Sequence, residues 1–246
     1  MPPRSVEIET HDGTCPAALC VPAGEGPWPG VLLYADAGGM RDTIRQMAAR
    51  LSELGYVVLA PDFYYRSGSY PAPDFSSPSA RDETMGRIMT LMSGYTTDLI
   101  LRDARTFVDF LEAVPETAPG GIGTTGYCMG GRMSLLVAAN LGDRIAAAAS
   151  FHGGNIANPD DPDSPHHKAS DIKAAVYAAG AIEDPYFTLE QRDLLEQSLR
   201  EAGVTFTIET YHAHHGFAVP DNQSYDDAAA ERHWLATEQF FGSALT

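Results

Sequence analysis

Short, almost wholly apolar runs alternate along this chain with longer segments of helical periodicity, and this alternation limits the possible folds more than any other feature. The runs at 31–34, 56–60 and 145–151 are bounded by turn residues, which is typical of strands buried on both faces of a sheet. Amphipathic segments of helical spacing lie at 45–54, 99–111, 132–140, 189–202 and 228–241. Strands that alternate with helices form a mostly parallel sheet with helices on both faces. Residues 1–246 contain no internal repeat or linker, so they are predicted to form one α/β domain.

The charge and composition of the chain exclude several classes of function. The 16 Lys and Arg residues against 33 Asp and Glu residues give a net charge of −17, so neither nucleic acid nor an anionic membrane surface is an expected partner. No apolar stretch approaches the roughly 20 residues of a membrane helix, and the first residues lack the apolar region of a secretory signal. Three cysteines cannot all pair within one chain, which favours a reduced, cytoplasmic protein.

Residues 64–97 interrupt the alternation. Ser, Pro and Gly are dense up to residue 79, and apolar side chains then follow at helical spacing, namely Met85, Ile88, Met89 and Met92. Such a stripe either packs into a core or covers a pocket. Methionine adapts to irregular apolar ligands, so we treat residues 64–97 as a candidate cap over a pocket.

The Gly-Tyr-Cys-Met-Gly-Gly segment at 126–131 carries the most specific chemical signal. A nucleophile on a sharp turn from strand to helix needs small residues two positions before and two positions after it, and glycines flank Cys128 in this way. The turn also places Cys128 at a helix N-terminus, where the helix dipole favours a thiolate. We therefore predict that Cys128 is a nucleophile, whereas Cys15 and Cys20 are expected to be ordinary strand thiols.

A thiolate nucleophile needs a base, and the base needs an orienting acid. On a strand-turn-helix elbow the three follow in the order nucleophile, acid, histidine. The loop after the strand predicted at 174–180 contains Glu183 and Asp184, and three histidines follow the strand predicted at 205–211, at positions 212, 214 and 215. Spacing alone leaves both the acid and the base open. These histidines lack a further evident metal ligand, so no metal and no cofactor are predicted.

Taken together, these residues make the chain similar to the dienelactone hydrolases, a branch of the α/β-hydrolase fold that uses a Cys-His-Asp triad. The resemblance covers most of the chain, and the segments that carry it are 31–34, 56–64, 126–131, Phe-His-Gly at 151–153 and His-Gly-Phe at 215–217. The cysteine elbow is the most specific of them, because most relatives in the wider fold use serine. The resemblance implies an α/β-hydrolase fold and a small-molecule ester or lactone substrate.

Position by position, the resemblance implies a triad of Cys128, His215 and Asp184. The family's histidine stands directly before a small residue and Phe, which selects His215. The family's aspartate stands four residues before the Pro or Thr that opens the next helix, and counting back from Thr188 selects Asp184. In this arrangement His215 takes the thiol proton, and Asp184 holds the histidine tautomer.

Three residues outside the triad complete the expected reaction centre. The backbone N–H groups of Ala37 and Met129 are expected to hold the oxyanion of the tetrahedral intermediate. The family also keeps a carboxylate, usually Glu, close to the resting thiol. Asp36 occupies that position, so it is expected to modulate the thiol, although its side chain is one methylene shorter than that of Glu.

The substrate-binding positions match the family less closely. Dienelactone hydrolases hold the carboxylate of their substrate with one arginine in the cap segment and one just past the catalytic histidine. Arg81 and Arg87 are candidates for the first arginine, but Val219 stands at the position of the second. His152 and Phe217 are further candidates for substrate binding. With one arginine missing, we expect an ester that is less anionic or more apolar.

The resulting prediction is a carboxylic ester or lactone hydrolase of the carboxymethylenebutenolidase type. One alternative is a thioesterase or other acyl hydrolase that uses the same triad. Another is a non-catalytic redox sensor that retains the thiol on the same fold.

Overall fold

An eight-stranded sheet runs through the molecule with the strand order β1-β2-β4-β3-β5-β6-β7-β8. The structure is a computed structural model that describes residues 3–245. The strands are β1 (Arg4–Thr10), β2 (Gly13–Cys20), β3 (Gly30–Tyr34), β4 (Val57–Pro61), β5 (Ile122–Tyr127), β6 (Ile145–Phe151), β7 (Ala175–Glu183) and β8 (Phe206–His214). β2 pairs antiparallel with both β1 and β4, and every later pairing is parallel. The prediction of a mostly parallel sheet is confirmed.

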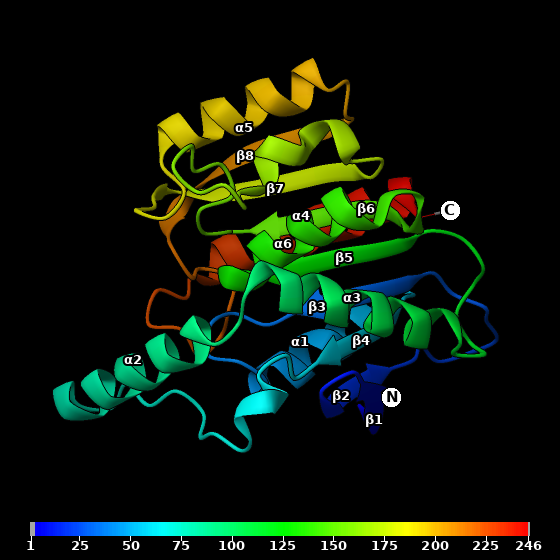
Figure 1. Cartoon of the computed structure of the whole chain (residues 1–246), viewed down its shortest axis with the longest axis horizontal. Coiled ribbons are helices and arrows are strands. Elements are labelled where there is room, and N and C mark those ends of the chain that lie inside the picture. Colours follow the sequence, from blue (N-terminus) through cyan, green and yellow to red (C-terminus); the bar gives the residue numbers. More distant parts are fainter. Residues whose placement is uncertain (1–2, 246) are drawn as a thin grey trace.

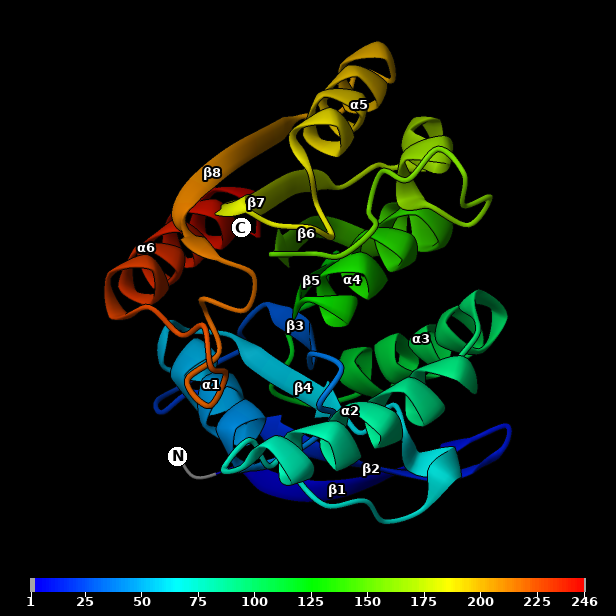
Figure 2. The same cartoon turned by 90° about the vertical axis from the view of Figure 1, so that its left-hand side faces the viewer.

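Helices cover both faces of this sheet. They are α1 (Asp42–Glu53), α2 (Pro78–Ser93), α3 (Thr97–Glu112), α4 (Met129–Leu141), α5 (Leu189–Glu201) and α6 (Asp227–Ala244), with three short 3₁₀ helices, η1 (Tyr65–Ser67), η2 (Gly142–Arg144) and η3 (Pro165–Asp171). Figure 2 shows α1 and α6 on one face of the sheet and α3, α4 and α5 on the other. This three-layer arrangement, together with the strand order and the antiparallel β2, is that of the α/β-hydrolase fold. Within residues 3–245, no helix is both long enough and apolar enough to cross a bilayer.

The apolar runs fold as buried strands because helices remove both of their faces from water. Every residue of β3 and β4 is buried, and in β5 all six residues are. The helices between them expose one polar face. In α3, for example, Ile100, Phe107 and Leu111 are buried, and the side chain of Thr96 caps the first turn by accepting from the Leu99 N–H.

The carboxyl ends of the parallel strands meet at one edge of the sheet, and this edge collects the chemical groups predicted above. β3 ends before Asp36, β5 ends before Cys128, β7 ends at Glu183 and β8 ends at His214. The segment 64–97 departs from the same region after β4. Its helix α2 projects from the body of the molecule in Figure 1.

Candidate active site

Cys128 occupies a strained turn between β5 and α4. Its φ of 54° and ψ of −117° lie in a region that L residues rarely adopt. The backbone around it is held from both sides: the Cys128 N–H points to the Phe151 carbonyl and to Nδ1 of His152, each at 3.1 Å, and its carbonyl accepts from the Gly131 N–H at 3.0 Å. The predicted elbow is therefore present, with the nucleophile position at its apex.

The glycines of the elbow are required by close backbone contacts. A Cβ on Gly126 would overlap the carbonyl of Gly130, and a Cβ on Gly130 would overlap the carbonyls of Tyr34 and Ala35. The second contact presses the start of α4 against the end of β3. For this reason Ala37 and Met129, the two residues expected to supply oxyanion donors, line the same cavity as Cys128.

His215 and Asp184 meet beside this elbow. Nδ1 of His215 lies 2.9 Å from each carboxylate oxygen of Asp184, whose side chain is fully buried, and the N–H of Tyr186 donates to Oδ1 of the same carboxylate at 3.0 Å. Burial alone would lower the pKa of His215. The hydrogen bond to Asp184 and the adjacent Cys128 outweigh burial and raise that pKa to about 10.

The alternative acid and base form a separate pair that faces solvent. Nδ1 of His214 lies 3.5 Å from a carboxylate oxygen of Glu183, and the two side chains are 67% and 74% exposed. His212 is exposed as well. Neither Glu183 nor His214 lines the cavity that contains Cys128. The geometry therefore brings together Cys128, His215 and Asp184.

His152 lies beside the backbone of Cys128. It is fully buried and has a positive φ of 40°, and its Nδ1 accepts from the Cys128 N–H. Burial, together with the neighbouring His215, lowers its pKa well below the usual range, so the ring is neutral. Phe217 is also fully buried and packs edge-on against His152, with ring centroids 5.1 Å apart.

The arginines predicted in the cap segment are not brought to the site. Arg81 is exposed, and Arg87 donates to the carbonyl of Ala72 at 3.3 Å; neither lines the cavity. Val219, at the position of the family's second arginine, is fully buried. The arginines that do line the cavity are Arg41 and Arg132.

Sequence reasoning missed the ion triplet that Arg41 forms on the cavity wall. The Arg41 guanidinium contacts Asp36 through two hydrogen bonds of 2.7 and 2.9 Å, and it contacts Asp221 through two of 2.7 and 2.8 Å. Burial would lower the pKa of Arg41, but the hydrogen bonds that its guanidinium donates to both carboxylates raise that pKa overall. The only sequence signal was an arginine in the loop after a buried strand. Its partner Asp221 lies 180 residues away.

The cavity at the elbow has a volume of about 680 Å³. One wall is apolar, and it is formed by Phe75, Met85, Ile88, Met89, Met92, Tyr95 and Ile100. The three methionines of this wall are too exposed to belong to the core: Met85 is 43% exposed, Met89 63% and Met92 37%. Of the two readings of the methionine stripe, lining of a pocket is the one consistent with this placement.

The fold and the cysteine elbow place the chain among the α/β-hydrolases, and comparison with known proteins narrows this class. The family model described as the dienelactone hydrolase family matches residues 15–245. The chain therefore belongs to the dienelactone hydrolase family, and it is a hydrolase of ester or lactone bonds.

Two relatives illustrate how much of the chain is shared. A protein of Methylorubrum extorquens, provisionally named a carboxymethylenebutenolidase, is 27% identical over 96% of this chain and 79% of its own length. A protein of Synechocystis sp. with the same provisional name is 28% identical over 92% of this chain and 91% of its own length.

Solved structures agree with the fold. A provisionally assigned dienelactone hydrolase from Klebsiella pneumoniae superposes with a TM-score of 0.80 at 23% identity, over 98% of each chain. The dienelactone hydrolase of Anabaena variabilis superposes with a TM-score of 0.70 at 17% identity, over 100% of each chain.

Proposed function

We propose that this enzyme cleaves uncharged, apolar esters or lactones through a thioester formed on Cys128, with His215 as the general base and acid and Asp184 as its orienting group. The observation that carries the proposal is the Asp184–His215 pair at 2.9 Å, set beside a cysteine on a strained elbow that opens into an apolar cavity.

In the first half of the reaction the substrate loses its alcohol. His215 holds the thiol proton as an imidazolium, and the Cys128 sulfur attacks the carbonyl carbon, so that a C–S bond forms. When the tetrahedral intermediate collapses, the C–O bond breaks and the departing alkoxide takes the proton from His215. With a lactone, the released hydroxyl remains attached to the acyl group.

In the second half water releases the acid. Neutral His215 removes a proton from water, and the hydroxide attacks the thioester carbon. The C–S bond breaks, which returns Cys128 as a thiolate beside the protonated His215. Asp184 stabilises that imidazolium in both halves of the reaction.

The oxyanion of both tetrahedral intermediates would be held by the backbone N–H groups of Ala37 and Met129. Support for this role comes from the contact between Gly130 and the end of β3, which sets the two loops side by side. Removal of one such donor typically costs about 2.7–4 kcal/mol of transition-state stabilisation.

The charges around the cavity favour an uncharged substrate. Arg41 already bonds to Asp36 and Asp221, and Arg132 already pairs with Asp161 at 2.8 Å. An incoming carboxylate would have to displace one of these partners. In this proposal Asp36 influences the thiol through its charge; both of its oxygens accept from Arg41, and Oδ1 also accepts from the Gly38 N–H at 2.9 Å.

Matched substitutions test the triad. We expect Cys128→Ala and His215→Ala to abolish hydrolysis of a small neutral ester such as p-nitrophenyl acetate. The control variants Cys20→Ala and His214→Ala should retain it, because Cys20 is fully buried elsewhere and His214 faces solvent. Full activity of either triad variant would refute the assignment. A thiol at Cys128 that is alkylated rapidly, in an enzyme that turns over no ester, would instead favour the redox-sensor alternative.

Paired substrates test the charge of the preferred ester. Two lactones of the same ring, one with a carboxylate substituent and one with a primary carboxamide in its place, have nearly the same size and differ in charge, and neither substituent adds a second ester bond. We expect the neutral member to have the higher kcat/KM. A higher kcat/KM for the carboxylate would contradict this part of the proposal and would leave the triad assignment standing.

A further inference from the structure

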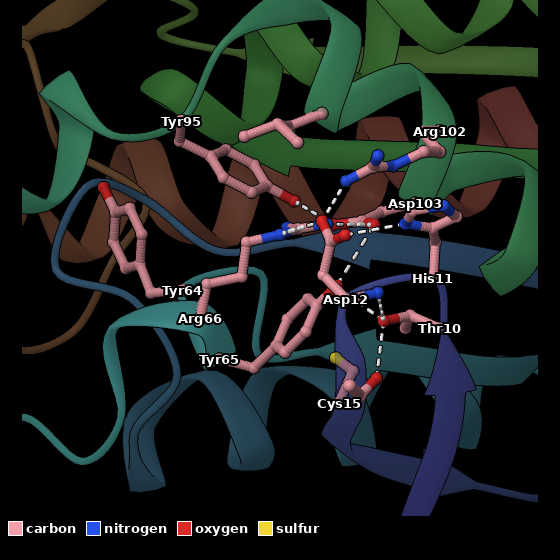
Figure 3. Close-up of polar contacts among 12 residues, drawn as sticks. Thr10, His11, Asp12, Cys15, Tyr64, Tyr65, Arg66, Tyr95, Arg102 and Asp103 are labelled. Atoms are coloured by element: carbon pink, nitrogen blue, oxygen red, sulfur yellow. Dashed lines mark hydrogen bonds and ion pairs between the residues drawn. The ribbon is translucent and has the colours of Figure 1, made fainter.

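A buried carboxylate on α3 lies outside the proposed reaction centre and accepts hydrogen bonds from two other parts of the chain. The side chain of Asp103 is 1% exposed. Arg66 donates to its two oxygens at 2.6 and 2.7 Å, Tyr95 donates to Oδ2 at 3.0 Å, and Tyr65 donates to Oδ1 at 3.3 Å. Figure 3 shows these side chains converging on Asp103.

The partners of Asp103 stand at the two ends of the 64–97 segment. Tyr65 and Arg66 belong to η1, where the segment leaves the sheet, and Tyr95 lies between α2 and α3, where the segment returns. The Asp103 carboxylate therefore joins the beginning and the end of the 64–97 segment, which contains the whole of α2.

A second layer of contacts holds this junction to the sheet. Asp12, in the turn between β1 and β2, accepts from Nε of Arg66 at 2.7 Å and also pairs with Arg102. Hydrogen bonds from His11 and Arg66 lower the pKa of Asp12 to about 2, so it stays ionised. The hydroxyls of Thr10 and Tyr65 lie 2.6 Å apart (Figure 3). The negative charges of Asp12 and Asp103 are balanced by the positive charges of Arg66 and Arg102.

The rest of the segment is held by fewer contacts. Tyr70 contacts the body through the Met40 N–H at 2.9 Å and through Asp62 at 2.5 Å. The polar contacts of Thr84 and Arg87 go to Asp74 and Ala72, inside the segment itself. The buried residues of α2 are Thr84, Ile88 and Leu91. The position of α2 therefore depends strongly on its anchored ends.

This dependence reaches the cavity, because the segment supplies most of its apolar wall. Tyr95 both bonds to Asp103 and lines the cavity, and Met85, Met89 and Met92 lie on the helix just before it. At the other end Tyr64, next to η1, donates to the Ala37 carbonyl at 3.4 Å and contacts the Met129 sulfur at 3.7 Å. Both ends of the segment thus touch the proposed binding site.

We propose that Asp103 is a positioning residue that determines substrate specificity: by joining both ends of the 64–97 segment, it fixes the apolar wall against which a long acyl or alkyl group packs. The inference rests on the proposed function, in that the cavity is taken to receive the substrate of Cys128. Asp103 does not line the cavity, so it acts only through the segment.

Two variants loosen the anchor without touching the cavity lining. Asp103→Asn keeps the size of the side chain and removes its charge, and Arg66→Lys keeps the charge and removes the two-fold contact with the carboxylate. The matched controls are Asp109→Asn on the solvent face of α3 and Arg50→Lys, which breaks a two-fold contact with Glu231 at the surface.

The decisive measurement is the ratio of kcat/KM for p-nitrophenyl octanoate to kcat/KM for p-nitrophenyl acetate. We expect both anchor variants to lower this ratio about tenfold, mostly through KM for the octanoate, which is the effect of losing one hydrogen bond to a charged group. Turnover of the acetate should change less than about twofold, since a loss of that size is within the range of a neutral substitution. Both control variants should keep the wild-type ratio.

An equal loss on both esters would show that Asp103 is merely structural and would overturn the proposal, as would an unchanged ratio in both variants. If Asp103→Asn does not fold, Arg66→Lys decides alone. Amide hydrogen exchange supplies an arm that needs no activity: exchange should rise at residues 65–67 and 94–96 in the anchor variants and stay unchanged in the controls. A wild-type enzyme without esterase activity would refute the proposed function, whereas unchanged exchange would refute the anchor.

Discussion

Replacement of Asp184 by asparagine tests the electrostatic core of the proposed mechanism. The carboxylate is fully buried and lies 2.9 Å from Nδ1 of His215 through both oxygens. Asparagine has almost the same shape but carries no charge. Its amide oxygen can replace Oδ1, which accepts from the Tyr186 N–H, and its NH₂ group would then face Nδ1 of His215. The histidine would be left without its acceptor and in the wrong tautomer.

The size of the effect follows from the geometry. Two opposite unit charges 2.9 Å apart interact with about 6 kcal/mol at an effective dielectric constant of about 20. The rise in the pKa of His215 from 6.5 to about 10, to which Cys128 also contributes, corresponds to about 5 kcal/mol. The Coulomb energy concerns Asp184 alone, whereas the pKa rise also contains the opposing effect of burial and the contribution of Cys128. A loss of about 4–5 kcal/mol of this stabilisation is expected to lower kcat/KM by about 10³-fold to 10⁴-fold in Asp184→Asn.

Two assays check this expectation. The first is kcat/KM for p-nitrophenyl acetate, with Glu183→Gln as the matched control. Glu183 and His214 are exposed and 3.5 Å apart, so kcat/KM of the control should fall less than about twofold. The second is the rate of alkylation of Cys128 by iodoacetamide at about pH 7, which should be lower in Asp184→Asn than in wild type, because the variant no longer stabilises a protonated His215 beside the thiolate. Retention of more than about a tenth of wild-type kcat/KM by Asp184→Asn would refute the reasoning, because an ion pair at this distance with a fully buried carboxylate is worth far more than tenfold.

Two further predictions concern stability. Because the pKa of His215 is raised on folding, its contribution to the free energy of unfolding is fully present below pH 6.5 and is lost as the pH rises through about 10. Urea titrations should therefore show wild type losing more stability than Asp184→Asn between about pH 7 and about pH 10. Parallel losses would contradict the proposed interaction between His215 and Asp184. Removal of the Arg41 guanidinium by Arg41→Met leaves the buried Asp36 without its cation, whereas Asp221 is exposed to water. This substitution should cost about 3–5 kcal/mol of unfolding free energy, against less than about 1 kcal/mol for Arg50→Met at the surface. Equal losses would mean that the buried Arg41–Asp36 pair does not stabilise the fold.

The layers of the fold could be predicted because they depend on local periodicity. A run such as 31–34 is apolar on both faces, so only a strand covered on both sides buries it, and β3 is fully buried. Element ends were harder to place. α4 begins at Met129 rather than near residue 132, because the glycines that follow Cys128 continue the helix directly from the turn.

The reaction centre could be predicted in part. The glycines around Cys128 are a local requirement of the turn, so the sequence predicted the elbow on which the proposed nucleophile stands. The choice among neighbouring histidines and between neighbouring carboxylates depended on which side chains turn inward. His214 is the last residue of β8 and faces solvent, whereas His215 lies just beyond the strand end and turns back to Asp184. The spacing of residues in the sequence does not indicate that His215 turns inward while His214 faces solvent.

The sequence by itself determined the class of fold and the strand-turn-helix elbow that presents Cys128, because each of these follows from periodicity or from a turn of a few residues. Only the tertiary structure decided which charged groups meet. Arg41 finds Asp221 across 180 residues, and Asp103 joins both ends of the 64–97 segment. Such ion pairs join elements that are far apart in the sequence and meet only when the chain folds. The sequence around a charged residue does not indicate which residue becomes its partner. The charge and the apolar wall of the cavity, which set the proposed specificity, are therefore properties of the folded molecule.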